Sequence, residues 1–466
     1  MYNIDWIAIE EFILTHSVFE IYWAMFVNGG WLLLAGAFWS GALKLWVLLR
    51  QIDFLGKFKW IFLAVAIPKG NEQTPKAVEQ IFAQLAGTHK TPDLEEAYLK
   101  GFMQRWFSFE IVSLEGYIQF IIGTESKRRD LVEAAVYAQY PDAEITEIED
   151  YTKGFPTQFP NPEYECFGSE FVLTNKNWVY PVRTYIEFEH STAEEVFKDP
   201  MAALLEAMSR IGKGEQIWLQ ILVKPIATID WQPQGILEVK KLIHAPLEAV
   251  STLPLLVRPP VHLTHTLIRF ADFLVGTIFG GEAGKEEKKK EVPPSQMLFL
   301  SPGEKLTVEK IERKIGKIGF ATKIRYVYIA KHEVFKQDRV THALVGALKQ
   351  FNDETANGFK PETKRTITKV HFFFKKPRAD RRRRKLVRAF KNRSRWAGMY
   401  EYVLNIEELA SIWHFPALTV RAPLMRKTEI KRGEPPADLP LRAAPATIEK
   451  AKPKPETPSN LPFGGE

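Results

Sequence analysis

Basic side chains are concentrated near the C-terminal end of the sequence, in "KKPRADRRRRKLVRAFKNRSR" (375–395). Between residues 364 and 395 there are fifteen Lys or Arg residues and one acid, Asp380, which gives this segment a net charge of +14. The whole chain carries +7, so the remainder carries −7. A mildly acidic protein with one strongly basic segment is expected to meet a local anionic partner with that segment.

Read as a helix, this stretch places Arg381, Arg384, Lys385 and Arg388 on one face. Such a face suits the phosphates of DNA, the anionic headgroups of a lipid bilayer, or an acidic surface on a partner protein, and water alone is a fourth alternative. Arg105 and Trp106 are further surface candidates. The candidate nucleic-acid or partner-binding residues are Lys375, Lys376, Arg378, Arg381, Arg382, Arg383, Arg384, Lys385, Arg388, Lys391, Arg393 and Arg395.

A search for catalytic residues finds no recognisable constellation. The segment most similar to a phosphate-binding loop is "GGEAGKEE" (280–287). It lacks both the spacing and the Ser or Thr of that motif. His262 and His265 are three residues apart but have no accompanying carboxylate or Cys, so we expect polar packing rather than a metal site. The single cysteine, Cys166, excludes a disulfide framework and is expected to be a buried thiol. We therefore predict no catalytic residues, no metal and no cofactor.

The N-terminal segment 1–56 contains 23 uncharged residues, "IYWAMFVNGGWLLLAGAFWSGAL" (21–43). A helix of about 20 apolar residues crosses a bilayer, and Trp and Tyr near both ends suit its interfaces. Acidic residues precede the stretch and Lys or Arg follow it. The prediction is a single transmembrane helix with the N-terminus outside the inner membrane and the body in the cytoplasm.

Residues 57–150 show the pattern of a ferredoxin-like unit. A strand is expected over 59–68, a helix after Thr74-Pro75, a hairpin around Glu115-Gly116, a helix over 126–140 and a strand over 143–148. The order β-α-β-β-α-β is that of the split βαβ sandwich.

The later parts of the chain alternate strands and helices again. Over 151–300 we expect strands at 184–189 and 215–223, a helix at 200–211, and a charged loop at 282–296; the apolar stretch 231–284 packs on the body or lies on the membrane. Over 301–425 we expect a capped helix from Ser301, strands at 320–330 and 363–374, a helix at 336–351, and a capped helix from Asn405. Residues 426–466 are Pro-rich and predict a disordered tail.

The predicted fold class is thus α+β: one N-terminal transmembrane helix, tandem ferredoxin-like α/β units, and a disordered C-terminal tail. Several long phrases also carry a resemblance to a known group of proteins. They are "PKAVEQIFAQL" (75–85), "RWFSFEIVSLEGYIQFII" (105–122), "LVEAAVYAQYPDAEITEIEDYTKGFP" (131–156), "GEQIWLQILVKP" (214–225), "IGFATKIRYVYIAKHEVF" (318–335), "YVLNIEELASIWHFP" (402–416) and "KRGEPPADLP" (431–440).

These phrases resemble the membrane-anchored N-terminal region, a domain of unknown function, of type IV secretion or conjugation-type proteins from candidate-phyla (patescibacterial) bacteria. The resemblance implies a non-catalytic scaffold that positions a separate DNA-translocating ATPase, since the ATPase module itself is missing here. The implied partners are that ATPase, the lipid bilayer, DNA and a second copy of the chain. The alternatives are a membrane-bound enzyme with a dispersed active site and a lipid-surface structural protein unrelated to DNA.

Overall fold

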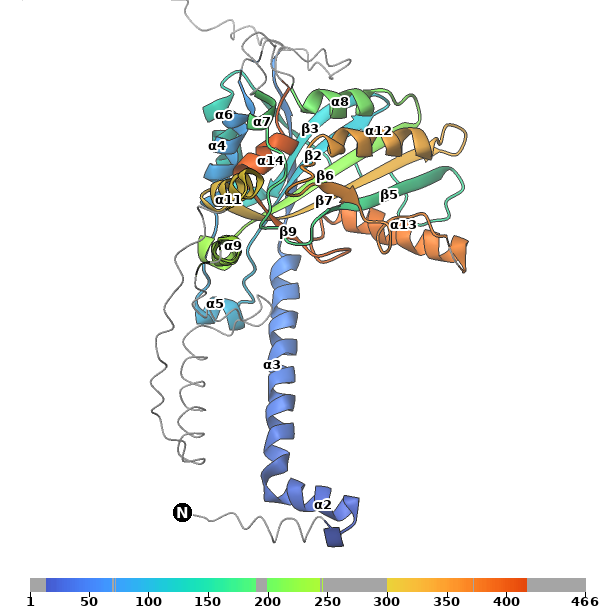
Figure 1. Ribbon diagram of the computed structural model, residues 1–466. Coiled ribbons are helices and arrows are strands. Elements are labelled where there is room, and N and C mark those ends of the chain that lie inside the picture. Colours follow the sequence, from blue (N-terminus) through green and yellow to red (C-terminus); the bar gives the residue numbers. More distant parts are fainter. Residues whose placement is uncertain are drawn as a thin grey trace, which may run out of the picture. The chain divides into compact units, whose positions relative to one another are not determined.

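The computed structural model describes residues 14–416, except 69–70, 72, 190–198, 244, 246–299 and 372. The predicted charged loop at 282–296, His262 and His265, and the C-terminal tail lie outside these residues. The described part is α+β and is built on one antiparallel sheet, whose strand order is β4-β1-β3-β2-β6-β7-β5-β8 with β9 paired to β7 (Figure 1).

The first half of the sheet has the β-α-β-β-α-β order expected from the sequence. Its elements are β1 (Trp60–Ala66), α4 (Pro75–Ala86), β2 (Phe107–Leu114), β3 (Tyr117–Glu125), α6 (Arg129–Gln139) and β4 (Glu144–Ile148). Glu115 and Gly116 form the hairpin turn, both with positive φ (55° and 95°), as a two-residue turn of this kind requires.

The second half repeats this plan. Its elements are β5 (Tyr164–Leu173), α8 (Met201–Ser209), β6 (Glu215–Pro225), β7 (Gly319–Lys331), α12 (Gln337–Lys349) and β8 (Phe359–Pro361). Both halves place their strands in the spatial order 4-1-3-2. They join edge to edge, because β2 pairs with β6 from Phe107↔Val223 to Leu114↔Gln216. The two ferredoxin-like units therefore share one continuous sheet.

Other elements of the fold are helices around this sheet and the ninth strand, β9, which pairs with β7. They are η2 (Ser126–Arg128), α5 (Leu94–Tyr98), α7 (Ile186–Glu189), α9 (Thr228–Leu242), α11 (Pro302–Ile315), α13 (Lys375–Lys391), β9 (Tyr402–Asn405) and α14 (Ile406–Ile412). Helices α11 and α14 begin at Ser301 and Asn405 with complete capping boxes, as the sequence predicts.

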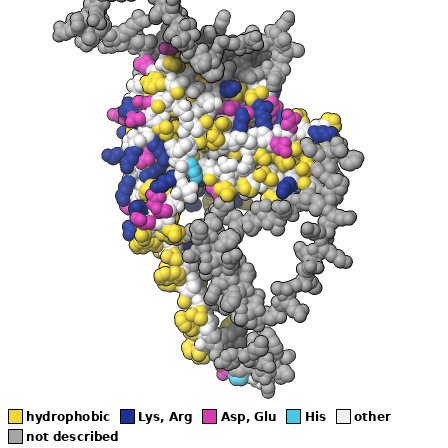
Figure 2. Space-filling view, turned by 90° about the vertical axis from the view of Figure 1, so that its left-hand side faces the viewer, with side chains coloured by type: hydrophobic (Ala, Val, Ile, Leu, Met, Phe, Trp, Pro, Cys, Tyr) yellow, Lys and Arg dark blue, Asp and Glu magenta, His cyan; other side chains and the backbone are white. Residues whose placement is uncertain are grey.

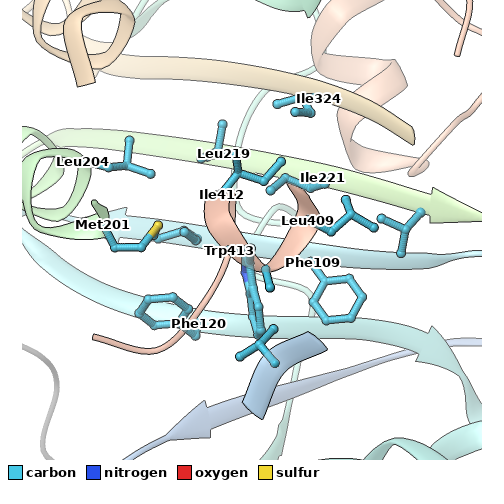
Figure 3. Close-up of a cluster of buried hydrophobic side chains, with 14 of the residues drawn as sticks. Phe109, Phe120, Met201, Leu204, Leu219, Ile221, Ile324, Leu409, Ile412 and Trp413 are labelled. Carbon is cyan, nitrogen blue, oxygen red and sulfur yellow. The ribbon is translucent and has the colours of Figure 1, made fainter. Parts of the chain in front are cut away.

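The two faces of the sheet carry separate hydrophobic cores, because successive strand side chains point to opposite faces. Leu63 belongs to the larger core, under α4, α6, α8, α12 and α14, whereas Phe62 belongs to the smaller core under α13. Figure 3 shows part of the larger core, where Trp413 lies edge-on to Phe109 with ring centroids 4.7 Å apart. The sheet thus presents one face to a layer of helices and the other to α13.

The prediction of a transmembrane helix over 21–43 is wrong, and with it the membrane localisation and that part of the fold class. Among the described residues no helix is both long and apolar enough to cross a bilayer. The uncharged stretch does not form one helix: α2 (Val18–Met25) is followed by a π-helical turn, η1 (Phe26–Gly30), and then by α3 (Trp31–Gly56). Helix α3 also carries the charges of Lys44, Arg50 and Asp53.

Large apolar side chains are exposed along much of α3, including Trp39 at 67%, and Figure 2 shows apolar side chains following this helix. Its C-terminal end contacts the body. The indole of Trp46 donates to the carbonyl of Tyr98 over 3.0 Å, and the ring centroids of Phe54 and Phe102 lie 5.6 Å apart. These contacts attach the end of α3 to the segment that precedes β2.

Two predicted strands are also wrong. Residues 184–189 contain the short helix α7, and its Phe188 packs against the ring of Phe351. Residues 363–374 form no strand where described, because the edge strand is β8, a few residues earlier. Glu362 instead accepts hydrogen bonds from the backbone N–H groups of Lys364, Arg365 and Thr366 and holds that segment in a turn.

Candidate polyanion-binding site on helix α13

Helix α13 contains most of the basic segment, and its apolar stripe fixes it to the sheet. Leu386, Val387 and Phe390 are buried in the smaller core. The ring of Phe390 lies 5.4 Å from that of Trp218 on β6. One side of α13 is thereby committed to packing, and the opposite side is left for the basic residues, as in any amphipathic surface helix.

The C-terminal end of α13 is held by a buried arginine on β7. Arg325 donates to the carbonyl oxygens of Ala389 and Ser394, each over 2.7 Å. Ala389 lies in the last turn of α13 and Ser394 in the segment that follows the helix, so Arg325 joins the two. Arg325 also forms an ion pair of 3.3 Å with Glu170 on β5, and both side chains are buried.

Arg393, just past the end of α13, is an internal structural residue rather than a surface cation. Its side chain is 1% exposed and its Nε lies 3.2 Å from Glu110 on β2, which is fully buried. It also bonds Asp150. Burial would lower the pKa of Arg393, but the charges of Glu110 and Asp150 outweigh burial and raise it. Arg393 therefore stays charged and links α13 to the first half of the sheet.

Several other predicted site residues are also engaged within the protein. Arg382 donates to the carbonyl of Ile367 over 2.9 Å, and Arg383 forms an ion pair with Asp380 over 2.8 Å. The Nζ of Lys391 donates to the carbonyl of Phe155 over 2.6 Å, and Arg395 pairs with Glu401. These four residues fix α13 and its flanking loops, so they are poor candidates for a ligand.

The remaining cations form an exposed face, which we call the basic face: Arg381, Lys385 and Arg388, at positions i, i+4 and i+7 of α13. All three side chains are exposed. Within the described residues none of them has a hydrogen bond or ion-pair partner in the structure. Three of the four residues predicted from helical spacing are therefore exposed together. The fourth, Arg384, is half-buried, and its Nε donates to the carbonyl of Asp380 over 3.4 Å. Lys375, Lys376 and Arg378 extend the basic face toward the N-terminus of α13 and are also exposed.

A groove runs beside the basic face. It has a volume of about 500 Å³ and lies between α13 and the segment that follows it, with lining residues Arg381, Arg384, Lys385, Arg388, Ala389, Asn392, Ser394 and Ala397. No acidic side chain lines it. A smaller cavity of about 200 Å³ adjoins it and does contain an acid, Glu170, which already pairs with Arg325 and accepts from the N–H of Met399. The groove is thus electropositive and suited to a linear anion.

The surface roles predicted for Arg105 and Trp106 are wrong, because both side chains are buried, at 6% and 4% exposure. The guanidinium of Arg105 lies 4.2 Å from the ring of Phe54 at the junction with α3. Trp106 donates its indole N–H to the carbonyl of Arg393 over 2.9 Å. These residues connect elements of the fold and offer nothing to a ligand.

Cys166 is buried, as the sequence predicts. Burial raises the pKa of its thiol well above the ordinary value of 9.0, so it is not a nucleophile at neutral pH. Within the described residues no group of His, Cys, Asp or Glu side chains is arranged to hold a metal ion.

Sequence reasoning missed the charged layer beneath α13. Lys323 and Arg325 stand two positions apart in the apolar strand β7, and this spacing is the available signal, since it places both on the sheet face opposite Ile324. Lys323 donates to the carbonyl of Ala397 over 2.9 Å, and so supports the wall of the groove. The carbonyl groups that accept from Lys323 and Arg325 lie far away in the sequence, so they could not be predicted from it.

A comparison with curated proteins found no match. A family model described as "Domain of unknown function (DUF8128)" matches residues 68–427, well over half of the chain and including all of α13. The chain therefore belongs to the DUF8128 family.

Proposed function

We propose that this protein is a non-catalytic docking component of a type IV secretion-like DNA-transfer system, and that it contacts DNA through the basic face of α13 while a separate DNA-translocating ATPase supplies the motor. The observation that carries the proposal is that the basic segment contains two groups of cations, one bonded inside the protein and one exposed. Arg382, Arg383 and Arg393 are held by internal acceptors, whereas the basic face and its groove are exposed.

The charge arrangement of α13 has a cost that a bound anion would offset. Like charges four residues apart on a helix destabilise it by about 0.2–0.5 kcal/mol per pair. Arg381 and Lys385 form such a pair, and Arg384 and Arg388 form another. Phosphates of a nucleic acid would neutralise these cations and release counterions, which is the main source of sequence-independent affinity for DNA.

The experiment is a fluorescence anisotropy titration of the full chain against a labelled 20-bp duplex at low salt. The test variant carries Arg381→Gln, Lys385→Gln and Arg388→Gln, which keep the length and helix propensity of the side chains. The control variant carries Lys153→Gln, Lys176→Gln and Lys213→Gln. These lysines are exposed and lie outside α13, and their replacement removes the same amount of charge.

The proposal predicts that the basic-face variant binds at least about tenfold more weakly, whereas the control variant stays within about threefold of the unmodified chain. Equal losses in the two variants would show that net charge alone drives binding. If the unmodified chain does not bind the duplex at low salt, the proposed DNA contact is rejected.

A further inference from the structure

Four exposed aromatic side chains flank α13 in the sequence. Phe373 and Phe374, immediately before α13, are 83% and 80% exposed, and Trp396 and Tyr400, which follow it, are 54% and 82% exposed. Folding normally buries such rings, because they carry the largest apolar surface of any side chain. The sequence pattern predicted that both phenylalanines lie in a strand, and their exposure became evident only from the structure.

The backbone conformation of Phe374 is unfavourable for a bulky residue. Its φ is 52° and its ψ 45°, in the left-handed region that bulky residues rarely adopt. The ring gains little packing in return, since most of it is exposed. Strain of this kind in an exposed residue points to a role in contact with something outside the chain.

After α13, the ring of Trp396 packs against a buried ring. Its ring lies edge-on to the buried Trp106, with centroids 5.3 Å apart and an interplanar angle of 90°. It belongs to the segment whose Ser394 and Ala397 form the second wall of the groove. One aromatic surface is thus held in a fixed orientation next to the groove.

We infer that the site takes single-stranded nucleic acid in preference to duplex. The cations of the basic face bind the phosphates, and the exposed aromatic rings that flank α13 stack on bases. Stacking of this type is available to every base and needs no sequence. A duplex offers only its phosphates to this surface, because its bases are already stacked inside. The inference rests on the proposed function and specifies the substrate class of the same site.

Helix α13 has 17 residues, which corresponds to a length of about 25 Å. A strand of 12 nucleotides at roughly 3.4 Å per phosphate is long enough to follow the whole basic face and reach the aromatic residues that flank α13. The test therefore uses three probes of that length against the full chain: oligothymidine, the same strand made entirely of abasic nucleotides, and a 12-bp duplex. The abasic strand carries the same phosphates and no bases.

The test variant combines Phe373→Ala with Tyr400→Ala, the two most exposed of these residues. Its control combines Tyr117→Ala with Tyr137→Ala, exposed aromatics on β3 and α6. We expect the unmodified chain to bind oligothymidine about tenfold or more tightly than the abasic strand. The test variant should lose that advantage and keep its affinity for the duplex, and the control should lose neither.

Equal binding of oligothymidine and the abasic strand, or an unchanged preference in the test variant, would overturn the inference while leaving DNA binding intact. A duplex bound more tightly than the single strand would overturn it as well. Failure to bind any of the three probes would instead reject the proposed function on which it rests.

Discussion

The Nε of Arg393 lies 3.2 Å from Oε1 of Glu110, and both side chains are buried. Arg393 follows α13, in the second half of the chain, whereas Glu110 lies in the middle of β2, in the first half. The pair therefore connects the basic helix to the strand at which the two halves of the sheet meet. Tyr151 and Gln220 also donate to Glu110, so the carboxylate is the centre of a buried polar network.

Replacing Arg393 by Met is expected to lower the free energy of unfolding by about 3 kcal/mol. The change leaves the buried side chain of Glu110 without its ion-pair partner, which costs far more than losing a surface pair. Chemical denaturation followed by tryptophan fluorescence measures the effect. As a control, Arg381→Met, at an exposed position of the same helix, should stay within about 0.5 kcal/mol of the unmodified chain. Equal stability of the two variants would contradict the structural role of Arg393.

Gly398 is expected to tolerate no side chain. Its φ is +92°, and a Cβ there would lie 2.2 Å from the carboxylate oxygens of Glu170. Gly398→Ala should therefore displace the groove wall and destabilise the protein by roughly 1–3 kcal/mol. Gly303→Ala is the matched control, since a Cβ at that position meets nothing within 4 Å. Thermal unfolding of both variants would reveal the difference, and similar midpoints would argue against the close approach to Glu170.

Gly101 is the corresponding test for the attachment of α3. Its φ is +66°, and a Cβ would lie 2.3 Å from the backbone of Arg50. We expect Gly101→Ala to loosen the end of α3 from the body and to speed tryptic cleavage after Arg50 several-fold. Gly154→Ala, at an open position, should leave the cleavage rate unchanged. Identical digestion of the two variants would show that this contact does not hold the helix.

Stability should fall in mild acid. Burial would raise the pKa of Asp150, but hydrogen bonds and charge from Arg393 outweigh it and lower the pKa below 3.8. Glu401 is lowered below 4.5 in the same way by Arg395. A carboxyl whose pKa is lower in the folded than in the unfolded state stabilises the fold above its unfolded pKa, and that stability is lost as pH falls through the folded value.

The free energy of unfolding should therefore decrease between about pH 5 and pH 3. The combined variant Asp150→Asn, Glu401→Gln should be less stable at neutral pH and show a shallower decrease. Urea denaturation at a series of pH values is the measurement. An unchanged pH dependence in this variant would mean that other carboxyl groups govern the acid transition.

Local patterns predicted most elements of the fold. The alternation of Ile217, Leu219 and Ile221 identified β6, and the capping boxes at Ser301 and Asn405 marked the beginnings of α11 and α14. The edge-to-edge pairing of β2 with β6 has no local signal, because both strands read as ordinary buried strands. The absence of charge over 21–43 suggested one long helix, but the π-helical turn at 26–30 divides that stretch.

The candidate site was predictable only in part. Helical spacing placed Arg381, Arg384, Lys385 and Arg388 on one face without knowledge of the fold, and of these only Arg384 is half-buried. It could not separate them from Arg393, because the partners Glu110 and Asp150 lie more than 200 residues away in the sequence. The DNA-binding role of the basic face stays a prediction.

The salt dependence of DNA binding tests the central claim most directly. The logarithm of the binding constant for a duplex should fall linearly with the logarithm of salt concentration, with a slope of about −0.9 for each phosphate neutralised. If the basic face binds phosphates, the variant with Arg381→Gln, Lys385→Gln and Arg388→Gln should show a slope shallower by about 2 to 3. An unchanged slope in this variant would contradict the assignment of the DNA contact to α13.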